Sequence, residues 1–344
     1  MVLLSIRNGS FDWGNFFTAG ATVGTPALLL PHLHFAWQKA HGIPVSPFIY
    51  VPAAAWIFWP EAHLPIAMGL AVFATFMAAL ATVSALLLAR IYCIKPWLAL
   101  VATFAWVPTA TGILVGQQAC LGLFLETLGI VGMVNEAPIL SGLAFGLLLY
   151  KPTLAIPFIV LLAARRAWQA LIVTAICAIA WYALSIFATA GDITWPVHYL
   201  HQNVTQSVSD HFMERSAQAI SVPKVLAFFH APTWLVVLSA IGILIAAAPI
   251  FARASALEAA SLAPLVGALG SVYIWSHDLT LLMPTLMFLG KRWTTFVMMA
   301  YALAATWVLW PIVKFNPEII VVVGLSILAL LEVKGRKATA LGVP

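Results

Sequence analysis

The stretch LPIAMGLAVFATFMAALATVSALLLA, residues Leu64 to Ala89, decides the fold class of this chain. It holds no charged residue and exceeds the roughly 20 apolar residues with which a helix crosses the hydrocarbon of a bilayer. Comparable runs recur at Pro96 to Val115, Trp168 to Ala190, Thr233 to Ala252, Ala256 to Ser276 and Trp293 to Val313. Shorter apolar runs lie between them, at Ala119 to Met133, Pro138 to Leu149, Pro152 to Ala164, Leu279 to Leu289 and Glu318 to Val333. Since lipid offers no hydrogen bonds to a backbone, we expect these runs to be helices, some short, tilted or re-entrant.

The composition agrees with a polytopic membrane protein. Of the 344 residues, 63% are hydrophobic and 8% are charged, and the mean hydropathy is +1.03, far from the values of a soluble domain. The prediction is an all-α bundle of about 11 helices that forms one integral membrane domain over residues 1–344. Cys93, Cys120 and Cys177 are isolated, without the spacing of a disulfide framework or a metal site. No cleavable signal peptide is visible.

The basic residues predict the orientation, because short cytoplasmic loops are enriched in Lys and Arg. With the N-terminal segment outside, 10 of the 16 basic residues fall on inner turns or on the tail. These are Arg90, Lys95, Arg165, Arg166, Arg253, Lys291, Arg292, Lys334, Arg336 and Lys337. The longer segments 1–63 and 191–232 then lie outside the plasma (inner) membrane, together with all nine histidines. The net charge of +5 is mostly a topology signal, so we expect no nucleic-acid partner.

The two outer segments contain most of the polar residues that could carry chemistry. Segment 1–63 reads as a loop with interfacial helices, in which Trp56 and Trp59 would lie at headgroup level. In segment 191–232, Asn203 and Gln206 offer neutral hydrogen-bonding groups suited to sugar hydroxyls. They are equally compatible with an ordinary polar loop.

Asp12 is a lone carboxylate in the aromatic stretch FDWGNFF, residues 11–17. Held near an acceptor hydroxyl, it would act as a general base that takes the proton while the oxygen attacks. The alternative is a solvated loop acid or a helix N-cap. The sequence places no second outer acid beside it. Hydrolysis of an ordinary glycosidic bond usually requires two carboxylates, whereas displacement of a phosphate leaving group requires only the base.

Gln117 and Lys151 each lie at the end of a predicted helix. The Gln117 amide could bind a hydroxylated substrate, although a Gln there is more often a capping residue. Lys151 separates two apolar runs, which is unfavourable unless the amine faces a cavity or pairs with an anion. It could face a phosphate from the outer side, or it could snorkel to the interface.

Histidines and buried acids provide the remaining candidates. His277, in Ser276-His277-Asp278, could donate to a phosphate oxygen or orient a base, while Asp278 could simply cap the next helix. His32-x-His34 resembles half a metal site, but without a nearby acid we predict no metal. Glu126 and Glu258 lie within predicted helices, where they could pair with polar neighbours or could equally mark a proton path.

The order of these features resembles the GT-C class of membrane glycosyltransferases, and most closely glycosyltransferase family 87, the polyprenyl-phosphate-mannose-dependent mannosyltransferases. The resemblance spans nearly the whole chain and depends on the shared order of loose motifs. The matching residues are Asp12 with Phe16, Phe17, Ala19 and Gly20; Pro47, Phe48, Tyr50 and Pro52; Gly116 and Gln117; Lys151 and Pro152, then Arg165, Arg166 and Trp168; Asn203, Gln206 and Ser207; and His277 with Leu281, Leu282 and Pro284. Family members usually have a transmembrane helix before the Asp, whereas 11 residues precede it here.

The resemblance implies a role for each matching polar residue. Asp12 would be the catalytic Asp of the first outer loop, and Lys151 with His277 would hold the donor phosphate. Tyr50, Gln117, Asn203 and Gln206 are then expected to bind substrate. No cofactor is expected.

The leading hypothesis is an inverting transferase that moves a sugar, mannose by resemblance, from a polyprenyl-phosphate donor to the hydroxyl of a glycan or glycolipid. A secondary transporter or lipid-linked sugar flippase is the alternative, with Glu126, Glu258 and Lys151 as coupling charges. Against it, the chain shows no internal repeat, and its polar residues collect on the outer side rather than at the midplane. A noncatalytic membrane scaffold would leave the outer His and aromatic clusters unexplained.

Overall fold

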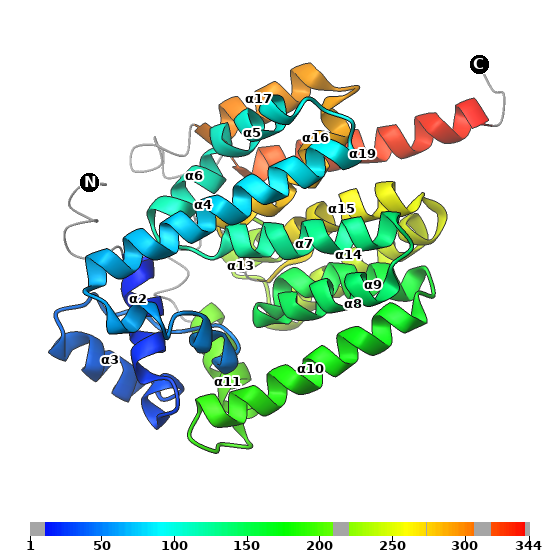
Figure 1. Ribbon diagram of the computed structural model, residues 1–344. Helices are drawn as coiled ribbons and strands as arrows, with labels where there is room; N and C mark the ends of the chain where they lie inside the picture. Colours follow the sequence, from blue (N-terminus) through cyan, green and yellow to red (C-terminus); the bar gives the residue numbers. More distant parts are fainter. Residues whose placement is uncertain (1–10, 209–219, 273, 306–317, 341–344) are drawn as a thin grey trace.

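The computed structural model describes residues 11–208, 220–272, 274–305 and 318–340. Every regular element within these ranges is a helix, which confirms the all-α prediction. Figure 1 shows the long helices running side by side, with α2 and α3 gathered at one end of the bundle. Asn203 and Gln206 belong to the helix α11 (Trp195–Val208), but their side chains lie outside the described part.

Three described helices are long and apolar enough to cross a membrane: α4 (Ile66–Ile91), α10 (Trp168–Ala188) and α14 (Thr233–Arg253). A fourth span results if α5 (Pro96–Ala105) and α6 (Val107–Leu114) are counted together, although they are bent by 66°. The bend falls at Trp106, whose backbone is extended, and Pro108 just beyond has no N–H to continue the helical ladder.

Apart from α19 (Glu318–Ala340), which has 23 residues, the remaining helices are shorter. Three of them follow α6: α7 (Ala119–Val134), α8 (Pro138–Leu147), which continues directly into the 3₁₀ helix η4 (Leu148–Tyr150), and α9 (Pro152–Ala164). Later in the chain come α13 (Val222–Phe228), α15 (Ala256–Gly270), η6 (Ser276–Leu282), α16 (Met283–Gly290) and α17 (Thr294–Ala305).

The predicted span Ala256 to Ser276 is wrong. Helix α15 ends at Gly270, because Ser271 is extended (φ −69°, ψ 131°) and the chain then leads into η6. An apolar composition does not distinguish a continuous helix from a helix followed by irregular backbone, which is tolerated at membrane depth where protein surrounds it. This break is important for the site, because η6 carries His277 and Asp278.

Small residues allow the central helices to approach closely. A Cβ added to Gly129 of α7 would lie 2.1 Å from the Phe145 ring of α8, and one added to Gly142 of α8 would lie 2.5 Å from the Ala170 carbonyl oxygen of α10. Such contacts are typical of helices that pack within a membrane, where small residues bring backbones together.

Residues 11–63 fold against the bundle through aromatic side chains. Its helices are α2 (Phe11–Thr22), η1 (Pro26–Leu28), α3 (Pro31–Ala40), η2 (Pro52–Ile57) and η3 (Glu61–His63). The Phe16 and Phe58 rings stack at 4.7 Å. Trp13 is fully buried and donates from Nε1 to the Ile66 carbonyl at 2.9 Å. Trp56 and Trp59 are 41% and 46% exposed, so both remain available to an interface.

Candidate functional site

The predicted site residues of α2, the segment before η2, the α6–α7 turn, α9 and η6 gather at one end of the bundle. The chain reaches this end because η4 stops at Tyr150 and α9 begins at Pro152, which leaves Lys151 at the helix junction. Val51 donates from its backbone N–H to the Tyr150 carbonyl at 3.3 Å. This bond holds Tyr50 close to Lys151.

Lys151 forms a buried ion pair with Asp278. Its Nζ lies 2.6 Å from Oδ1 and 2.7 Å from Oδ2 of the carboxylate. The two side chains are 6% and 3% exposed. Lys151 therefore does not snorkel to the surface, and Asp278 does more than cap a helix.

Asp278 is held in place by its own helix. The Trp275 backbone N–H donates to Oδ2 at 3.0 Å. Burial raises the pKa of the Asp278 carboxyl, but the opposing effects of Lys151, His277 and the Trp275 N–H together lower it below its ordinary value. The carboxylate is therefore charged at neutral pH.

His277 lies beside this ion pair. Its Nε2 is 3.9 Å from Asp278 Oδ1 and has no hydrogen-bond partner within the described residues. Burial lowers the pKa of His277, and Lys151 adds to this effect, while the negative charges of Asp278 and Asp12 oppose it. A buried ring nitrogen without a partner is available to a ligand that approaches from this side.

Tyr50 and Gln117 contact each other at the same end. The Tyr50 hydroxyl donates to Gln117 Oε1 at 3.3 Å, and the Tyr50 ring centre lies 5.4 Å from Lys151 Nζ. The neighbouring Gln118 is 2% exposed, and neither atom of its side-chain amide has a hydrogen-bond partner in the described chain. Gln118 is a polar residue of the site that the sequence reading did not select.

Asp12 occupies the first turn of α2 and is half-buried. Its position is set by Trp13, which packs against the turn that carries Gln117: a Cβ on Gly116 would lie 3.0 Å from the Trp13 Cβ. Gly116 adopts φ +75°, a conformation that favours glycine. Asp12 is close enough for its charge to affect His277.

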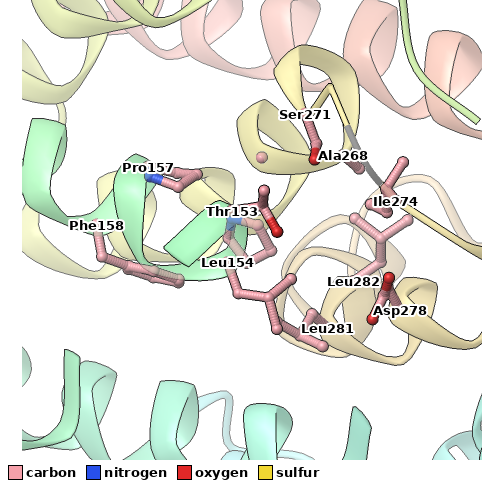
Figure 2. Close-up of a pocket in the computed structure, with 12 residues that line it drawn as sticks. Thr153, Leu154, Pro157, Phe158, Ala268, Ser271, Ile274, Asp278, Leu281 and Leu282 are labelled. Atoms are coloured by element: carbon pink, nitrogen blue, oxygen red, sulfur yellow. The ribbon is translucent and has the colours of Figure 1, made fainter. Parts of the chain in front are cut away.

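An apolar pocket opens next to the ion pair. Figure 2 shows it between α9 and α15, with the Asp278 carboxylate at its edge and the Thr153 and Ser271 hydroxyls on its wall. Its other lining residues are apolar: Leu154, Pro157, Phe158, Pro264, Gly267, Ala268, Ile274, Leu281 and Leu282. The pocket therefore places apolar surface next to a carboxylate and two hydroxyls.

Other candidates lie elsewhere or are used structurally. His34 Nε2 lies 3.2 Å from Asn15 Oδ1, whereas His32 is exposed, so the two histidines do not converge. Across the described residues, no group of three or more His, Cys, Asp or Glu side chains could hold a metal ion. Glu258 forms a capping box with Ser255. Glu126 is fully buried in α7, without a hydrogen-bond partner among the described residues.

The comparison with protein-family models matches residues 48–276 to Glycosyltransferase family 87. The chain belongs to glycosyltransferase family 87. This confirms the resemblance and makes the protein a glycosyltransferase with apolar helices suited to a bilayer. Comparisons with curated proteins and with solved structures give no significant match. Of the predicted site residues, Asp12 precedes the matched range and His277 directly follows it. The others fall inside it: Tyr50, Gln117, Lys151, Asn203 and Gln206.

Proposed function

We propose that this family 87 enzyme transfers mannose from a polyprenyl-phosphate donor to an acceptor hydroxyl on a glycan or glycolipid. The transfer inverts the anomeric centre and takes place on the extracytoplasmic side of the plasma membrane. The observation that carries the proposal is the position of Lys151 and His277. Both lie within 4 Å of Asp278, beside an apolar pocket and within the field of Asp12. A phosphate needs cationic or N–H donors, and an isoprenoid needs apolar surface.

In this mechanism Asp12 accepts the proton of the acceptor hydroxyl. The acceptor oxygen forms a bond to the anomeric carbon while the bond from that carbon to the donor phosphate oxygen breaks. The phosphate keeps the electron pair and is stabilised by Lys151 and His277, so no acid is needed to protonate it. A single attack from the opposite face inverts the anomeric centre.

The remaining polar residues would bind substrate. The Gln117 amide, oriented by Tyr50, is placed to bind sugar hydroxyls, and we assign Asn203 and Gln206 the same role. We also propose that residues 1–344 form one integral membrane domain, in which 1–63 and 191–232 are extracytoplasmic.

The donor is tested with purified protein in lipid nanodiscs. We expect transfer of labelled mannose from polyprenyl-phosphate-mannose to extracted glycolipid acceptors, and no transfer from a nucleotide-linked mannose. Transfer from the nucleotide sugar alone would contradict the donor. Transfer of another sugar from its polyprenyl phosphate would retain the mechanism and change only the sugar.

The orientation is tested by cysteine labelling of intact cells. Leu200 in α11 is 59% exposed and Arg166, after α9, is also exposed, so a cysteine can be placed at either position. The background should carry Cys93→Ser, because Cys93 is exposed. We expect an impermeant thiol reagent to label Leu200→Cys and to spare Arg166→Cys. The reverse pattern would place the site on the cytoplasmic side.

A further inference from the structure

The ion pair in the site is electrically neutral, although the site is proposed to bind an anion. Both oxygens of Asp278 contact Lys151 Nζ, at 2.6 and 2.7 Å. The Asp278 side chain is 3% exposed, so little water screens its charge. A site built only for tight phosphate binding would be stronger without this carboxylate.

The reaction itself changes the charge of the phosphate. In the donor, the phosphate is a diester with one negative charge. When the bond from the anomeric carbon to oxygen breaks, the phosphate becomes a monoester with a second ionisation near pH 6 and a charge of roughly −1.5 to −2 at pH 7. An uncompensated cation would therefore hold the product more tightly than the donor and slow its release.

On the basis of the proposed function, we infer that Asp278 cancels the preference that Lys151 alone would give to the doubly charged product, so that the site binds the singly charged donor at least as tightly. Asp278 positions the Lys151 ammonium through its two contacts and offsets its charge. The same carboxylate repels a phosphate in proportion to the phosphate charge, so the polyprenyl phosphate product experiences about twice the repulsion of the donor. Asp278 acts through Lys151 and through its own field, and it needs no contact with substrate.

Direct binding measurements separate this role from a structural one. Two ligands are compared on the full-length protein at pH 7.5: a polyprenyl phosphate and its methyl ester, a diester with one charge. The Asp278→Asn variant keeps the side-chain volume and an oxygen that can accept the Trp275 N–H. We expect this variant to bind the monoester about tenfold more tightly relative to the diester than the wild type does. Structural damage would weaken the binding of both ligands and leave the ratio of their dissociation constants unchanged.

Asp278→Glu serves as the charge-retaining control, and its ratio of the two dissociation constants should stay close to that of the wild type. The wild type provides a test that needs no variant: it should bind the diester at least as tightly as the monoester, despite the extra charge of the monoester. A wild type that prefers the monoester tenfold would overturn the inference, as would equal changes for both ligands in Asp278→Asn. Absence of binding of either ligand to the wild type would instead overturn the proposed function.

Discussion

Helix α9 has a basic residue at each end, and the two ends differ. Lys151 precedes the first residue of α9, is 5% exposed and pairs with Asp278. Arg165 follows the last residue, is half-buried and donates from Nη1 to the carbonyls of Phe251 and Ala254, at 3.1 and 2.6 Å. Lys151 therefore requires a buried anion from a distant segment, whereas Arg165 satisfies backbone carbonyls at the end of the neighbouring helix α14.

The helix dipole explains why this difference matters. A cation at the C-terminus of a helix is stabilised by about 0.3–1 kcal/mol, whereas a cation at the N-terminus meets the positive end of the dipole. Arg165 is therefore placed favourably relative to the dipole of α9, and Lys151 is placed unfavourably. A buried ion pair is also weak as a source of stability, because desolvation offsets its attraction. Residues that local stability does not account for are expected at functional sites.

If the active site lies at the Lys151 end of α9, replacing Asp12 should have the largest effect on the rate of sugar transfer. Asp12→Asn should lower transfer by about 10²- to 10⁴-fold, because the acceptor proton loses its base. Donor affinity and the yield of folded protein should stay near wild type. The measurement is the single-turnover rate with saturating donor. Asp192→Asn is the matched control, since Asp192 lies in segment 191–232 and pairs with His198 at 2.9 Å. Equal losses in the two variants would remove Asp12 from the mechanism.

Replacing each cation of α9 by Met compares the two ends directly. Lys151→Met leaves Asp278 buried without its cation, which should lower stability by about 3–5 kcal/mol. It should also raise the donor KM of the folded fraction more than the acceptor KM. Arg165→Met removes two hydrogen bonds to carbonyls and should lower stability by about 1–3 kcal/mol. Its kcat/KM per folded molecule should be unchanged. A donor-specific defect in Arg165→Met would contradict the assignment of donor binding to the Lys151 end and of stability to the Arg165 end.

Much of the fold was predictable from the sequence because the length of an apolar run is a direct physical constraint. The predicted runs Leu64 to Ala89 and Thr233 to Ala252 correspond to helices Ile66–Ile91 and Thr233–Arg253. Breaks within such runs were not predictable in the same way. The bend at Trp106 depends on packing around its indole, which donates to the Leu279 carbonyl at 2.8 Å.

The site was predictable as a set of residues and not as a set of contacts. A Lys between apolar runs predicts a partner or a cavity, but nothing in the sequence identifies Asp278, which lies 127 positions away. The pairing of Tyr50 with Gln117 spans 67 positions and likewise depends on the assembled bundle. Asp278 could have been selected only by asking which buried acid balances the buried Lys.

Acid should loosen α2 and α3 before it affects the Arg165 end of α9. Burial lowers the pKa of His34 from 6.5 to about 4. Between these values the unfolded segment binds a proton and the folded one does not, so stability is lost as pH falls from 6.5 towards 4. At pH 5.5 the loss is about 1.4 kcal/mol, or roughly tenfold in the opening equilibrium.

Hydrogen exchange of α2 and α3 at pH 7.5 and 5.5, corrected for intrinsic rates, measures this effect. His34→Gln should remove the acid-dependent change because it has no group that titrates, and the exposed His32→Gln should retain it. Equal acid sensitivity of α2 and of the Arg165 end of α9 would show that the cause is general rather than His34.

The smallest effect should come from a glycine that lies against His277. A Cβ on Gly112 of α6 would lie 3.5 Å from the His277 Cβ and 3.9 Å from the Gln117 Cβ, which are ordinary contact distances. Gly112→Ala should therefore fit and raise stability by about 0.5–1 kcal/mol, because alanine favours a helix. Transfer should stay close to wild type.

Gly116, four residues along, provides the contrast. Its φ of +75° is strained for alanine, and a Cβ there would lie 2.9 Å from Leu70 Cδ1 and 3.0 Å from the Trp13 Cβ. Gly116→Ala should lower stability by at least about 1–2 kcal/mol, and it should reduce transfer because Trp13 sets the position of Asp12. Thermal unfolding and donor turnover of the two variants, measured side by side, check both statements. If Gly112→Ala reduced turnover as much as Gly116→Ala, the site would depend on open space beside His277 rather than on the packing of Trp13 against the α6–α7 turn.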